Sequence, residues 1–566
     1  MNKKIVTKML SLVLSLTLCL AVLGGCFGRG DGSGGQIDKT KTQLYVNTFY
    51  AGLGDDWLKR YKSEFEEFYQ DKSFEDGKTG VEIIIDYSYS SGYSQLEQIV
   101  SSRAEVIWGE AAKHTQIAAG GIAYPITDLI DKPLTEFGED ATIADKIEPE
   151  LLDYYKAFNG NVYVLPWFDY LKGVIYDIDI FEGKQTNGQG FYIAKDGGFT
   201  NGLAGSPEKS AGPNNIPGDY DDGLPATYDE FTAMMNFMVI CGITPFTLAG
   251  STTYVDSLFI DLWMNEEGEE ALLNYTFDGI ATDLIDVAAD GTITKLPDTK
   301  ITNENAYMVY KQEGRYRAYQ YARWFTSNPA YFTEDSFSLS QSHVQSLREL
   351  LYNQVDRPGK QKPAMAVNGV WWEGEANTIF QDMEAMDKKY GKMNRRFGWM
   401  PLPFFSQAQA GETRQQILGT EQETCVFISK NIAPEKLELA KKFLQFTSTD
   451  AMIVAHAEEN GAPRSLKVQD LSMLENSKKL TTFGKSVVEG MSKSKLLYPV
   501  STNKFQWHVG YNLNALFNVA TVGAKPYSSL TRAMYENPSL TAIDYFNGIY
   551  TTNQVKWQNL LDTYKE

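Results

Sequence analysis

The first stretch of chain that can enter a folded core alternates between strand-like and helix-like patterns, and this alternation restricts the fold more than any other feature of the sequence. Residues 44–49 form a short run typical of a β-strand, and residues 81–87 have a continuous apolar centre that suits a strand covered on both faces. Residues 94–102 are predicted to form a helix, and residues 105–109 a third strand. This order predicts an α/β fold in which helices cover a parallel sheet.

Between the first two strands, aromatic residues recur every three to four positions. They are Trp57, Tyr61, Phe65 and Phe68, and they would share one face of a helix. Such a row could form a platform for a ligand, but the helical spacing favours a stripe that faces the core. We therefore predict a buried helix face here.

Composition excludes several classes of protein. The chain has 566 residues, and 52 Lys and Arg stand against 72 Asp and Glu, which gives a net charge of −20. A surface this acidic repels polyphosphate, so no nucleic-acid partner is expected. The four His residues include no HExxH pair, and the four Cys residues show no CxxC spacing. We therefore expect no histidine-built metal centre and no disulfide framework.

No motif for a bound cofactor is complete. Gly484-Lys485-Ser486 resembles the end of a phosphate-binding loop, but the position five residues earlier, which requires glycine, is Lys479. The glycines that follow the first predicted strand lack the third glycine of a dinucleotide fingerprint. No cofactor is therefore expected.

The first 26 residues resemble the leader of a bacterial lipoprotein. A basic start precedes a largely apolar run over residues 9–23, which is short for a membrane span but suits a signal peptide. The run ends in LGGC (23–26), which resembles a lipobox, where the leader is cut before a cysteine that carries a lipid. We predict a signal peptide over 1–25, a lipidated Cys26 and a flexible tether over 26–42, which would hold the protein at the extracellular face of the cell membrane. An ordinary secretory signal is the alternative.

Aromatic and acidic residues stand together at three predicted strand ends and loops. Indole faces stack on the C–H face of a pyranose, and fixed carboxylates accept hydrogen bonds from its hydroxyls, so this combination favours a sugar ligand. The groups are Trp108 with Glu110, Trp167 with Asp169, and Trp371 and Trp372 with Glu373. Core packing is an equal alternative for each Trp. Adjacent Trp residues cannot both face one side of a strand, so at least one of that pair is expected to be structural.

Seven stretches of the chain form a recognisable series. They include AMAVNGVWWEGE (364–375), FGWMPLPFF (397–405) and GAPRS (461–465), and the others are residues 104–130, 158–181, 224–250 and 418–451. In this order, behind a lipobox, the series resembles the extracellular solute-binding proteins (family 1) of carbohydrate ABC transporters, the family that includes maltose-binding protein. The resemblance covers most of the chain after the leader but does not extend to residues 183–223 or 270–360.

The resemblance implies two α/β lobes joined by a hinge, with an oligosaccharide bound in the cleft between them. Lobe 1 would comprise residues 43–168 and 411–456, and lobe 2 would comprise residues 172–405 and 463–566. Members of this family close the hinge over their sugar and deliver it to the permease subunits of an ABC importer. The resemblance therefore implies a binding protein that is not an enzyme, and we expect a monomer.

The resemblance also implies a set of cleft residues. These are Trp108, Glu110, Trp167, Asp169, Trp371, Trp372, Glu373 and Arg464, with Trp263 and Trp507 as further candidates on lobe 2 helices. The family often has Asp at the position of Glu110, so this chain departs from the family pattern at that residue.

Residues 183–223 contain ten glycines and are predicted to form a surface insertion. The end of the insertion places Asp219, Asp221 and Asp222 at a spacing that could hold Ca²⁺, but the closing Glu of a calcium-binding loop is missing. A solvated acidic turn is the favoured interpretation.

Two other functions stay open at this point. A surface glycoside hydrolase could use two of Glu110, Asp169, Glu373 and Glu375 as catalytic carboxylates. A binding protein for peptides or another solute would need cleft charges that hold the peptide termini, whereas the 10 Trp and 33 Tyr residues favour sugar.

Overall fold

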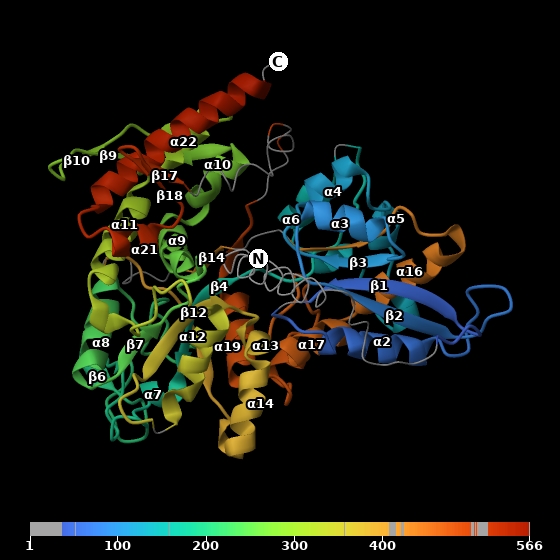
Figure 1. Ribbon diagram of the computed structural model, residues 1–566, viewed down its shortest axis with the longest axis horizontal. Helices are drawn as coiled ribbons and strands as arrows, with labels where there is room; N and C mark the ends of the chain where they lie inside the picture. The colour runs from blue at the N-terminus through green and yellow to red at the C-terminus, as the bar shows by residue number, and fades with distance from the viewer. Residues whose placement is uncertain are drawn as a thin grey trace, which may run out of the picture.

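The computed structural model describes residues 37–50, 52–157, 159–355, 357–406, 415–419, 424–499, 503, 505 and 519–564. The predicted signal peptide, Cys26 and Trp507 lie outside these residues. Within them the chain builds two four-stranded sheets, each with its own helices, and Figure 1 shows the two assemblies next to each other. The α/β class predicted from the sequence is confirmed. No helix in the described part of the chain has the length and apolar character needed to span a membrane.

The first sheet contains the three strands predicted near the start of the chain. β1 (Thr42–Phe49) lies between β2 (Val81–Ser88) and β3 (Val106–Gly109) and is parallel to both. A fourth strand, β15 (Cys425–Ile428), pairs with β3 in the antiparallel direction. The sheet is therefore mixed rather than wholly parallel. β15 joins it only after the chain has built the second sheet. This sheet and the helices packed on it are called the first body below.

The helix between the first two strands, α2 (Asp56–Phe68), packs against the first sheet through the predicted aromatic stripe. Trp57, Tyr61 and Phe65 are fully buried, whereas Phe68 is 47% exposed. Phe68 is the last residue of the helix, and its ring packs against Phe137 at the rim of the body, with the centroids 5.2 Å apart. The predicted stripe is therefore correct for three residues and wrong for the fourth, because the helix ends there.

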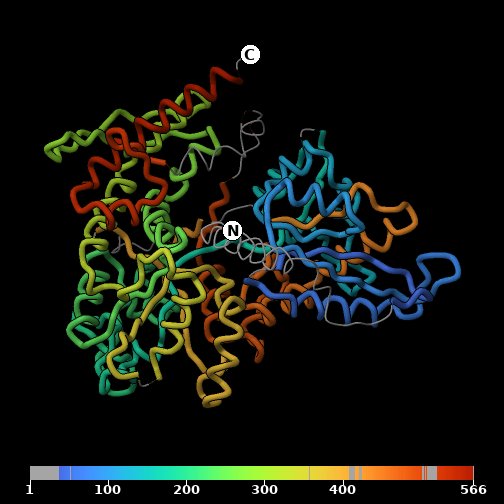
Figure 2. Tube along the Cα trace, in the orientation of Figure 1, coloured from blue at the N-terminus to red at the C-terminus, as the bar shows by residue number. Residues whose placement is uncertain are grey.

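Two helices from late in the chain complete the first body. They are α16 (Pro434–Thr447) and α17 (Asp450–Asn460), and α17 packs against α2. Figure 2 shows this orange segment beside the blue start of the chain. The chain therefore passes between the two bodies more than once.

The second sheet has the strand order β13-β4-β12-β7. It consists of β4 (Lys172–Asp177), β7 (Thr244–Thr247), β12 (Pro363–Gly369) and β13 (Phe397–Met400). β12 is parallel to β7, whereas β4 is antiparallel to both of its neighbours. β4 is the strand through which the chain enters from the first body, and it runs opposite to the strands that follow. This sheet and its helices are called the second body.

The remaining elements are mostly helical. The other helices are α3 (Tyr93–Val100), α4 (His114–Gly120), α5 (Thr127–Ile130), α6 (Pro149–Tyr155), α7 (Ile178–Phe181), α8 (Tyr228–Ile240), α9 (Tyr254–Glu267), α10 (Leu273–Thr276), α11 (Glu313–Thr326), α12 (His343–Leu351), α13 (Trp372–Glu375), α14 (Asn377–Met386), α18 (Ser472–Glu475), α19 (Thr482–Lys493), α21 (Leu530–Glu536) and α22 (Ala542–Tyr564). Short 3₁₀ helices are η1 (Thr135–Phe137), η2 (Ala144–Lys146), η3 (Gly268–Leu272), η4 (Ala306–Lys311), η5 (Pro329–Tyr331), η6 (Tyr352–Gln354) and η7 (Lys388–Tyr390). The smaller strands are β5 (Tyr192–Ile193), β6 (Phe199–Thr200), β8 (Gly279–Ala281), β9 (Ile285–Val287), β10 (Ile293–Lys295), β11 (Thr299–Ile301), β14 (Ile417–Gly419), β16 (Lys495–Leu497), β17 (Ala520–Val522) and β18 (Lys525–Tyr527).

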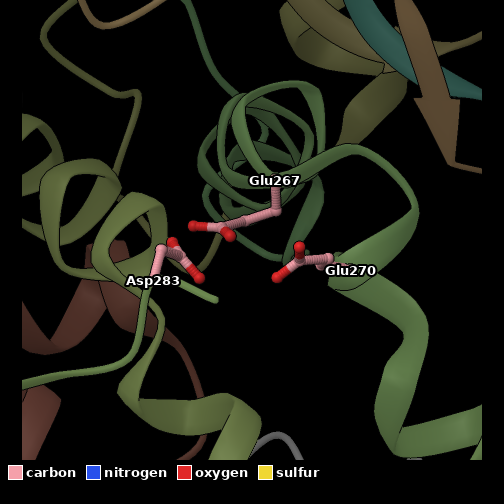
Figure 3. A group of neighbouring side chains, drawn as sticks. All are labelled: Glu267, Glu270 and Asp283. Carbon is pink, nitrogen blue, oxygen red and sulfur yellow. The ribbon is translucent and has the colours of Figure 1, made fainter. Parts of the chain in front are cut away.

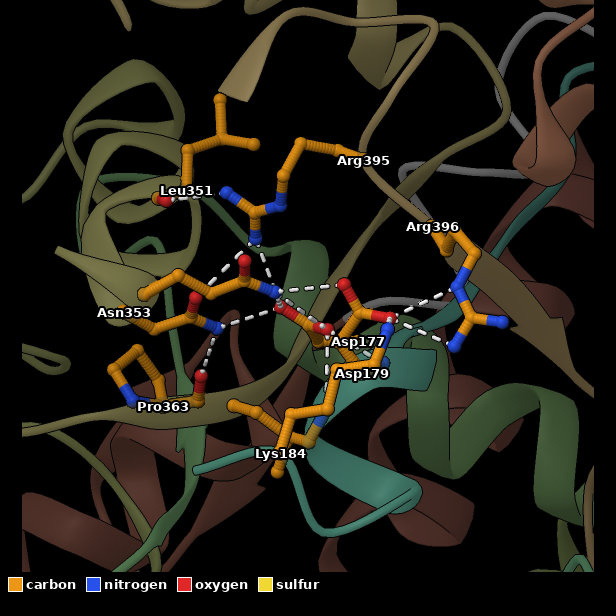
Figure 4. A network of polar contacts seen from close by, with 10 residues as sticks. Asp177, Asp179, Lys184, Leu351, Asn353, Pro363, Arg395 and Arg396 are labelled. Atoms are coloured by element: carbon orange, nitrogen blue, oxygen red, sulfur yellow. Dashed lines mark hydrogen bonds and ion pairs between the residues drawn. The ribbon is translucent and has the colours of Figure 1, made fainter. Parts of the chain in front are cut away.

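A buried polar network holds the end of β4 in place (Figure 4). The carboxylate of Asp177 accepts hydrogen bonds from Arg395 Nη2 at 2.8 Å and from Asn353 Nδ2 at 3.1 Å. Arg395 also donates to the backbone carbonyl of Leu351, and Asn353 donates to that of Pro363. One carboxylate therefore fastens β4 to the end of α12 and, through Asn353, to the start of β12.

The glycine-rich insertion over 183–223 is folded onto the second body. Its two strands, β5 and β6, pair in the antiparallel direction. Phe199 of β6 stacks on Phe237 of α8, with the ring centroids 4.3 Å apart. The insertion is therefore packed against a helix of the second body.

The three aspartates at the end of this insertion contact different partners. Asp219 pairs with Lys493, and the fully buried Asp221 accepts a hydrogen bond from the backbone N–H of Asn214 at 2.9 Å. Asp222 accepts from a backbone N–H of its own turn. In the described chain their oxygens do not form a group within 4.8 Å of one another. These contacts fit an acidic turn, but the solvated turn that the sequence favoured is wrong for Asp221, because this side chain is fully buried.

Candidate ligand-binding site

A pocket of about 290 Å³ lies where the two bodies meet. Lys113 and Tyr154 reach it from the first body, and Tyr170 and Lys172 reach it from the connection that enters β4. The rest of the wall comes mainly from helices of the second body. Seven lining residues are aromatic: Tyr154, Tyr170, Trp263, Tyr275, Tyr310, Tyr319 and Tyr545. Flat rings with polar tips suit a ligand that has both apolar faces and hydroxyl groups.

Three helices of the second body build this wall through residues three or four positions apart. α9 supplies Asp256, Ile260 and Trp263, α11 supplies Arg315 and Tyr319, and α22 supplies Tyr545 and Ile549. Residues at this spacing lie on one face of a helix. Because α11 packs against both α9 and α22, these faces border one cavity.

Arg315 and Trp263 form the most constrained part of the wall. The guanidinium carbon of Arg315 lies 3.7 Å from the ring centroid of Trp263 and 4.4 Å from that of Tyr310, and the side chain is 7% exposed. The indole N–H of Trp263 donates to Gln312 Oε1 at 3.2 Å. This hydrogen bond fixes the plane of the indole, and the indole fixes the plane of the guanidinium.

Acidic groups also line the pocket. Asp256 Oδ1 accepts hydrogen bonds from the backbone N–H of Thr531 at 2.9 Å and from its hydroxyl at 2.6 Å. Burial raises the pKa of Asp256 above its usual value. Asp261 lies five residues further along α9 and also lines the pocket. The site therefore offers carboxylate acceptors as well as cationic donors.

No protein-family model matches the chain, and no curated protein sequence matches it. Solved structures do match. A chitin oligosaccharide binding protein has a TM-score of 0.53 at 13% identity, covering 92% of this chain and 99% of its own. RafE from Streptococcus pneumoniae has a TM-score of 0.52 at 12% identity, covering 93% and 100%, and maltose-bound MalE3 from T. maritima has 0.52 at 14% identity, covering 91% and 100%. The chain has the two-lobed fold of these sugar-binding proteins. The fold expected from the sequence resemblance is therefore confirmed.

In this two-lobed fold, Trp108 and Trp167 lie in the core of the first body. Both are at most 1% exposed, and their ring centroids lie 4.9 Å and 5.4 Å from that of Trp57. Trp167 Nε1 donates to His456 Nε2 at 3.1 Å. Burial lowers the pKa of His456 well below its usual value, so the imidazole is neutral and can accept this hydrogen bond. Neither indole lines the pocket.

Arg464 is fixed where the chain leaves the first body for the second. Its side chain is 3% exposed, and the guanidinium carbon lies 5.1 Å from the ring centroid of Trp108. It donates to the backbone carbonyl groups of Pro166 at 3.3 Å and Trp167 at 3.4 Å, and its backbone pairs with that of Phe168. These contacts brace the connection that continues into β4.

The adjacent indoles of Trp371 and Trp372 have different surroundings. Trp372 is fully buried against Phe397, with the ring centroids 5.0 Å apart. Trp371 is 4% exposed, and its Nε1 donates to Glu375 Oε1 at 3.0 Å. Its ring centroid lies 4.3 Å from that of Tyr170, which lines the pocket. Trp371 therefore supports the pocket wall from behind.

The predicted acidic residues also lie away from the pocket wall. Glu373 is 1% exposed, accepts a hydrogen bond from the hydroxyl of Thr481 at 2.9 Å, and has its pKa raised by burial. Asp169 is 2% exposed, and Glu110 is half-buried just after β3. Of the predicted ligand residues that the structure describes, Trp263 alone lines the pocket.

The sequence interpretation missed most of the pocket. Arg315, Tyr310 and Tyr319 belong to the 270–360 region, where no stretch resembles the family. The signal that could have identified them is the helical spacing of Arg315 and Tyr319, which places a charge on the same helix face as an aromatic residue.

A second pocket, of about 440 Å³, is strongly acidic. Carboxylate oxygens of Glu267, Glu270 and Asp283 lie within 4.8 Å of one another, and Figure 3 shows the three side chains converging. Glu267 Oε1 accepts a hydrogen bond from the backbone N–H of Gly314 at 2.6 Å. Burial and the neighbouring Asp283 raise the pKa of Glu267 well above its usual value. Oxygen ligands at this spacing could hold a hard cation such as Ca²⁺.

Proposed function

We propose that this protein captures an oligosaccharide in the pocket between its two bodies and delivers it to the permease subunits of an ABC importer. The observation that carries the proposal is the composition of the pocket wall: aromatic rings from the second body, closed on the other side by Tyr154 and Lys113 of the first. Rings of this kind stack on pyranose faces, and the charged groups between them can hydrogen-bond to hydroxyls. The sugar ligands named for proteins of the same fold agree with this assignment.

Capture proceeds by closure of the hinge. The sugar first stacks on the wall that α9, α11 and α22 supply, and the first body then swings Tyr154 and Lys113 over it. The closed form is favoured because it alone makes both sets of contacts. Closure also removes water, so a sugar that lacks a required hydroxyl leaves a buried polar group unpaired and binds more weakly.

The amino-terminal segment keeps the protein beside its transporter. After cleavage behind residue 25, the lipid on Cys26 anchors the chain at the extracellular face of the membrane. The glycine-rich tether that follows has about 16 residues and reaches about 20–25 Å. The anchor raises the local concentration of the binding protein near the permease. A monomer is sufficient for this role.

A thermal-shift screen of the purified protein against oligosaccharides and short peptides tests the proposal. A ligand at about a hundred times its Kd adds about 2.7 kcal/mol to the free energy of unfolding, which raises the melting temperature by several degrees. We expect such a shift with particular oligosaccharides, recovered intact afterwards. Recovery of cleaved sugar would instead establish a glycoside hydrolase, and a shift with peptides alone would overturn the sugar assignment.

The variant Trp263→Ala tests whether the sugar binds in this pocket. It removes one indole from the pocket wall, so the stabilisation by sugar should shrink relative to that of the unaltered protein. An unchanged shift would place the sugar elsewhere on the molecule.

A further inference from the structure

We propose that the ligand of this pocket is an acidic oligosaccharide, whose carboxylate or sulfate group is bound by Arg315. This inference rests on the proposed function and adds the chemical class of the sugar. It follows from the burial of Arg315 in the pocket wall and from the charges of the other residues that line the pocket.

The charge of Arg315 is buried but not neutralised. The side chain is 7% exposed, and no ion pair joins it to a carboxylate among the residues that the structure describes. Arginine stays protonated at every physiological pH, so the side chain cannot avoid the cost of burying its charge by losing its proton. Buried charges in proteins are normally paired. Here a partner is missing at a side chain that borders a cavity.

The geometry leaves one edge of the guanidinium for that partner. The rings of Trp263 and Tyr310 lie against the guanidinium, with their centroids 3.7 Å and 4.4 Å from its carbon. Nη1 lies 3.4 Å from the hydroxyl of Tyr319, whereas Nε is buried without a hydrogen-bond partner and Nη2 has none in the described chain. The Nε–Nη2 edge presents two parallel donors, the arrangement that binds a carboxylate or a sulfate through two oxygens.

The rest of the pocket supports an anionic ligand. Lys113, Lys172 and Arg315 line it, against two carboxylates, Asp256 and Asp261. Asp256 is held by Thr531 and makes no ion pair with Arg315. The chain as a whole carries a net charge of −20, whereas this pocket has more cationic than anionic side chains. A neutral hydroxyl would leave the buried positive charge uncompensated, whereas an anion would neutralise it.

Matched pairs of oligosaccharides test the inference. Each pair consists of a neutral trisaccharide and the corresponding uronate, which differ only in the group at C6. The pairs are taken from the galactose, glucose and mannose series. Neutral trisaccharides and uronates form two arms of the experiment, and sulfated trisaccharides form the third. Isothermal titration calorimetry should give one acidic member a Kd about 10- to 100-fold lower than that of its neutral partner, the range of a charge-assisted hydrogen-bonded pair. The arm that binds distinguishes a carboxylate ligand from a sulfate ligand.

Three variants assign the effect to Arg315. Arg315→Met should lose the preference for the acidic sugar by about 10- to 100-fold, and Arg315→Lys should retain part of it because the charge stays but the fork is lost. Arg317→Met is the matched control, since Arg317 lies on the same helix, pairs with Glu313 and does not line this pocket. It should bind like the unaltered protein.

The outcomes separate this inference from the proposed function. Binding of neutral sugars as tightly as their uronates and sulfates overturns the inference and leaves the oligosaccharide assignment standing. Acidic preference that survives Arg315→Met overturns the role of Arg315. Binding of no sugar in any arm overturns both proposals. If Arg315→Met does not fold, the comparison of acidic and neutral sugars on the unaltered protein decides the ligand class, and Arg315→Lys decides the residue.

Discussion

Nη2 of Arg395 lies 2.8 Å from Oδ2 of Asp177, and the two side chains are 1% and 0% exposed. The pair sits where β4 ends, and Figure 4 shows it inside the larger network with Asn353. Because water cannot reach either group, each charge depends on the other. The position of β4 matters for the ligand site, since Lys172 at its start and the preceding Tyr170 line the pocket.

Arg395→Met is expected to destabilise the protein by about 3–5 kcal/mol, because it leaves the buried carboxylate of Asp177 without its cation. Urea unfolding of the purified variant measures this loss. Lys195→Met is the control: its side chain is 76% exposed and that of its partner Glu208 is 79% exposed, so the loss should stay below about 1 kcal/mol. Equal losses in the two variants would show that the network with Asp177 is no more sensitive than a surface ion pair.

Trp108→Phe should lower stability without changing sugar binding, whereas Trp263→Ala should weaken sugar binding. Trp108 packs in the indole cluster of the first body, so its truncation should lower the free energy of unfolding by about 1–3 kcal/mol and leave the affinity for sugar unchanged. Trp263→Ala should weaken binding by at least about tenfold through the lost stacking surface. Calorimetry on both variants checks this, and weaker sugar binding by Trp108→Phe would instead support the direct ligand contact that the family resemblance implied.

The sequence predicted the elements of the fold better than the composition of the site. Helical and strand periodicity reports which face of an element is buried, so the strands β1 to β3 and helix α2 could be predicted. The same periodicity does not tell whether a buried face meets the core or a ligand. Trp108 and Trp167 satisfy both interpretations in the sequence, and only packing against Trp57 separates them.

The pocket itself could not be predicted, because its wall is assembled from distant helices. Arg315 is more than 50 residues from Trp263 along the chain and about 230 residues before Tyr545, yet all three line one cavity. Local patterns carry no information on which helix faces meet. The adjacent Trp371 and Trp372 are an instructive exception, because their neighbouring positions predicted at least one structural indole, and Trp372 is fully buried.

Glu267→Gln is expected to stabilise the protein at neutral pH. Burial and Asp283 raise the pKa of Glu267 in the folded state, so the folded protein holds this proton more tightly than the unfolded chain does. Stability is therefore lost as the pH rises above the ordinary glutamate value of 4.5 towards the raised value. Replacement by Gln removes that loss, with a gain on the order of 1 kcal/mol at neutral pH that vanishes in acid.

Thermal unfolding of Glu267→Gln and the unaltered protein across this pH range provides the measurement. Glu269→Gln is the matched control, since the side chain of Glu269 is 73% exposed, and it should follow the unaltered protein at every pH. A gain in stability for Glu267→Gln that is the same in acid as at neutral pH would mean that it does not come from ionisation of Glu267.

Sugar binding should contract the protein. Small-angle scattering is expected to show a smaller radius of gyration with a bound oligosaccharide, because closure brings the two bodies together over the pocket. Lys113→Ala removes a contact from the first body, so binding should weaken by about tenfold and the contraction should become smaller. Lys132→Ala, at an exposed position of the same body, is the control. Tight binding without any contraction would contradict the hinge mechanism.

Cys26→Ala should release the protein from the membrane. The folded part carries no helix suited to span a membrane in its described residues, and loss of the predicted leader removes three lysines and takes the net charge from −20 to −23. An acidic surface is repelled by anionic lipid head groups, so attachment would depend on the lipid alone.

Cell fractionation and labelling with a radioactive fatty acid should find the unaltered protein in the membrane and labelled, and Cys26→Ala unlabelled and released. Cys19→Ala, inside the predicted leader, should behave like the unaltered protein. If the unaltered protein is itself released and unlabelled, residues 1–25 act as an ordinary secretory signal, and capture then takes place without a tether to the transporter.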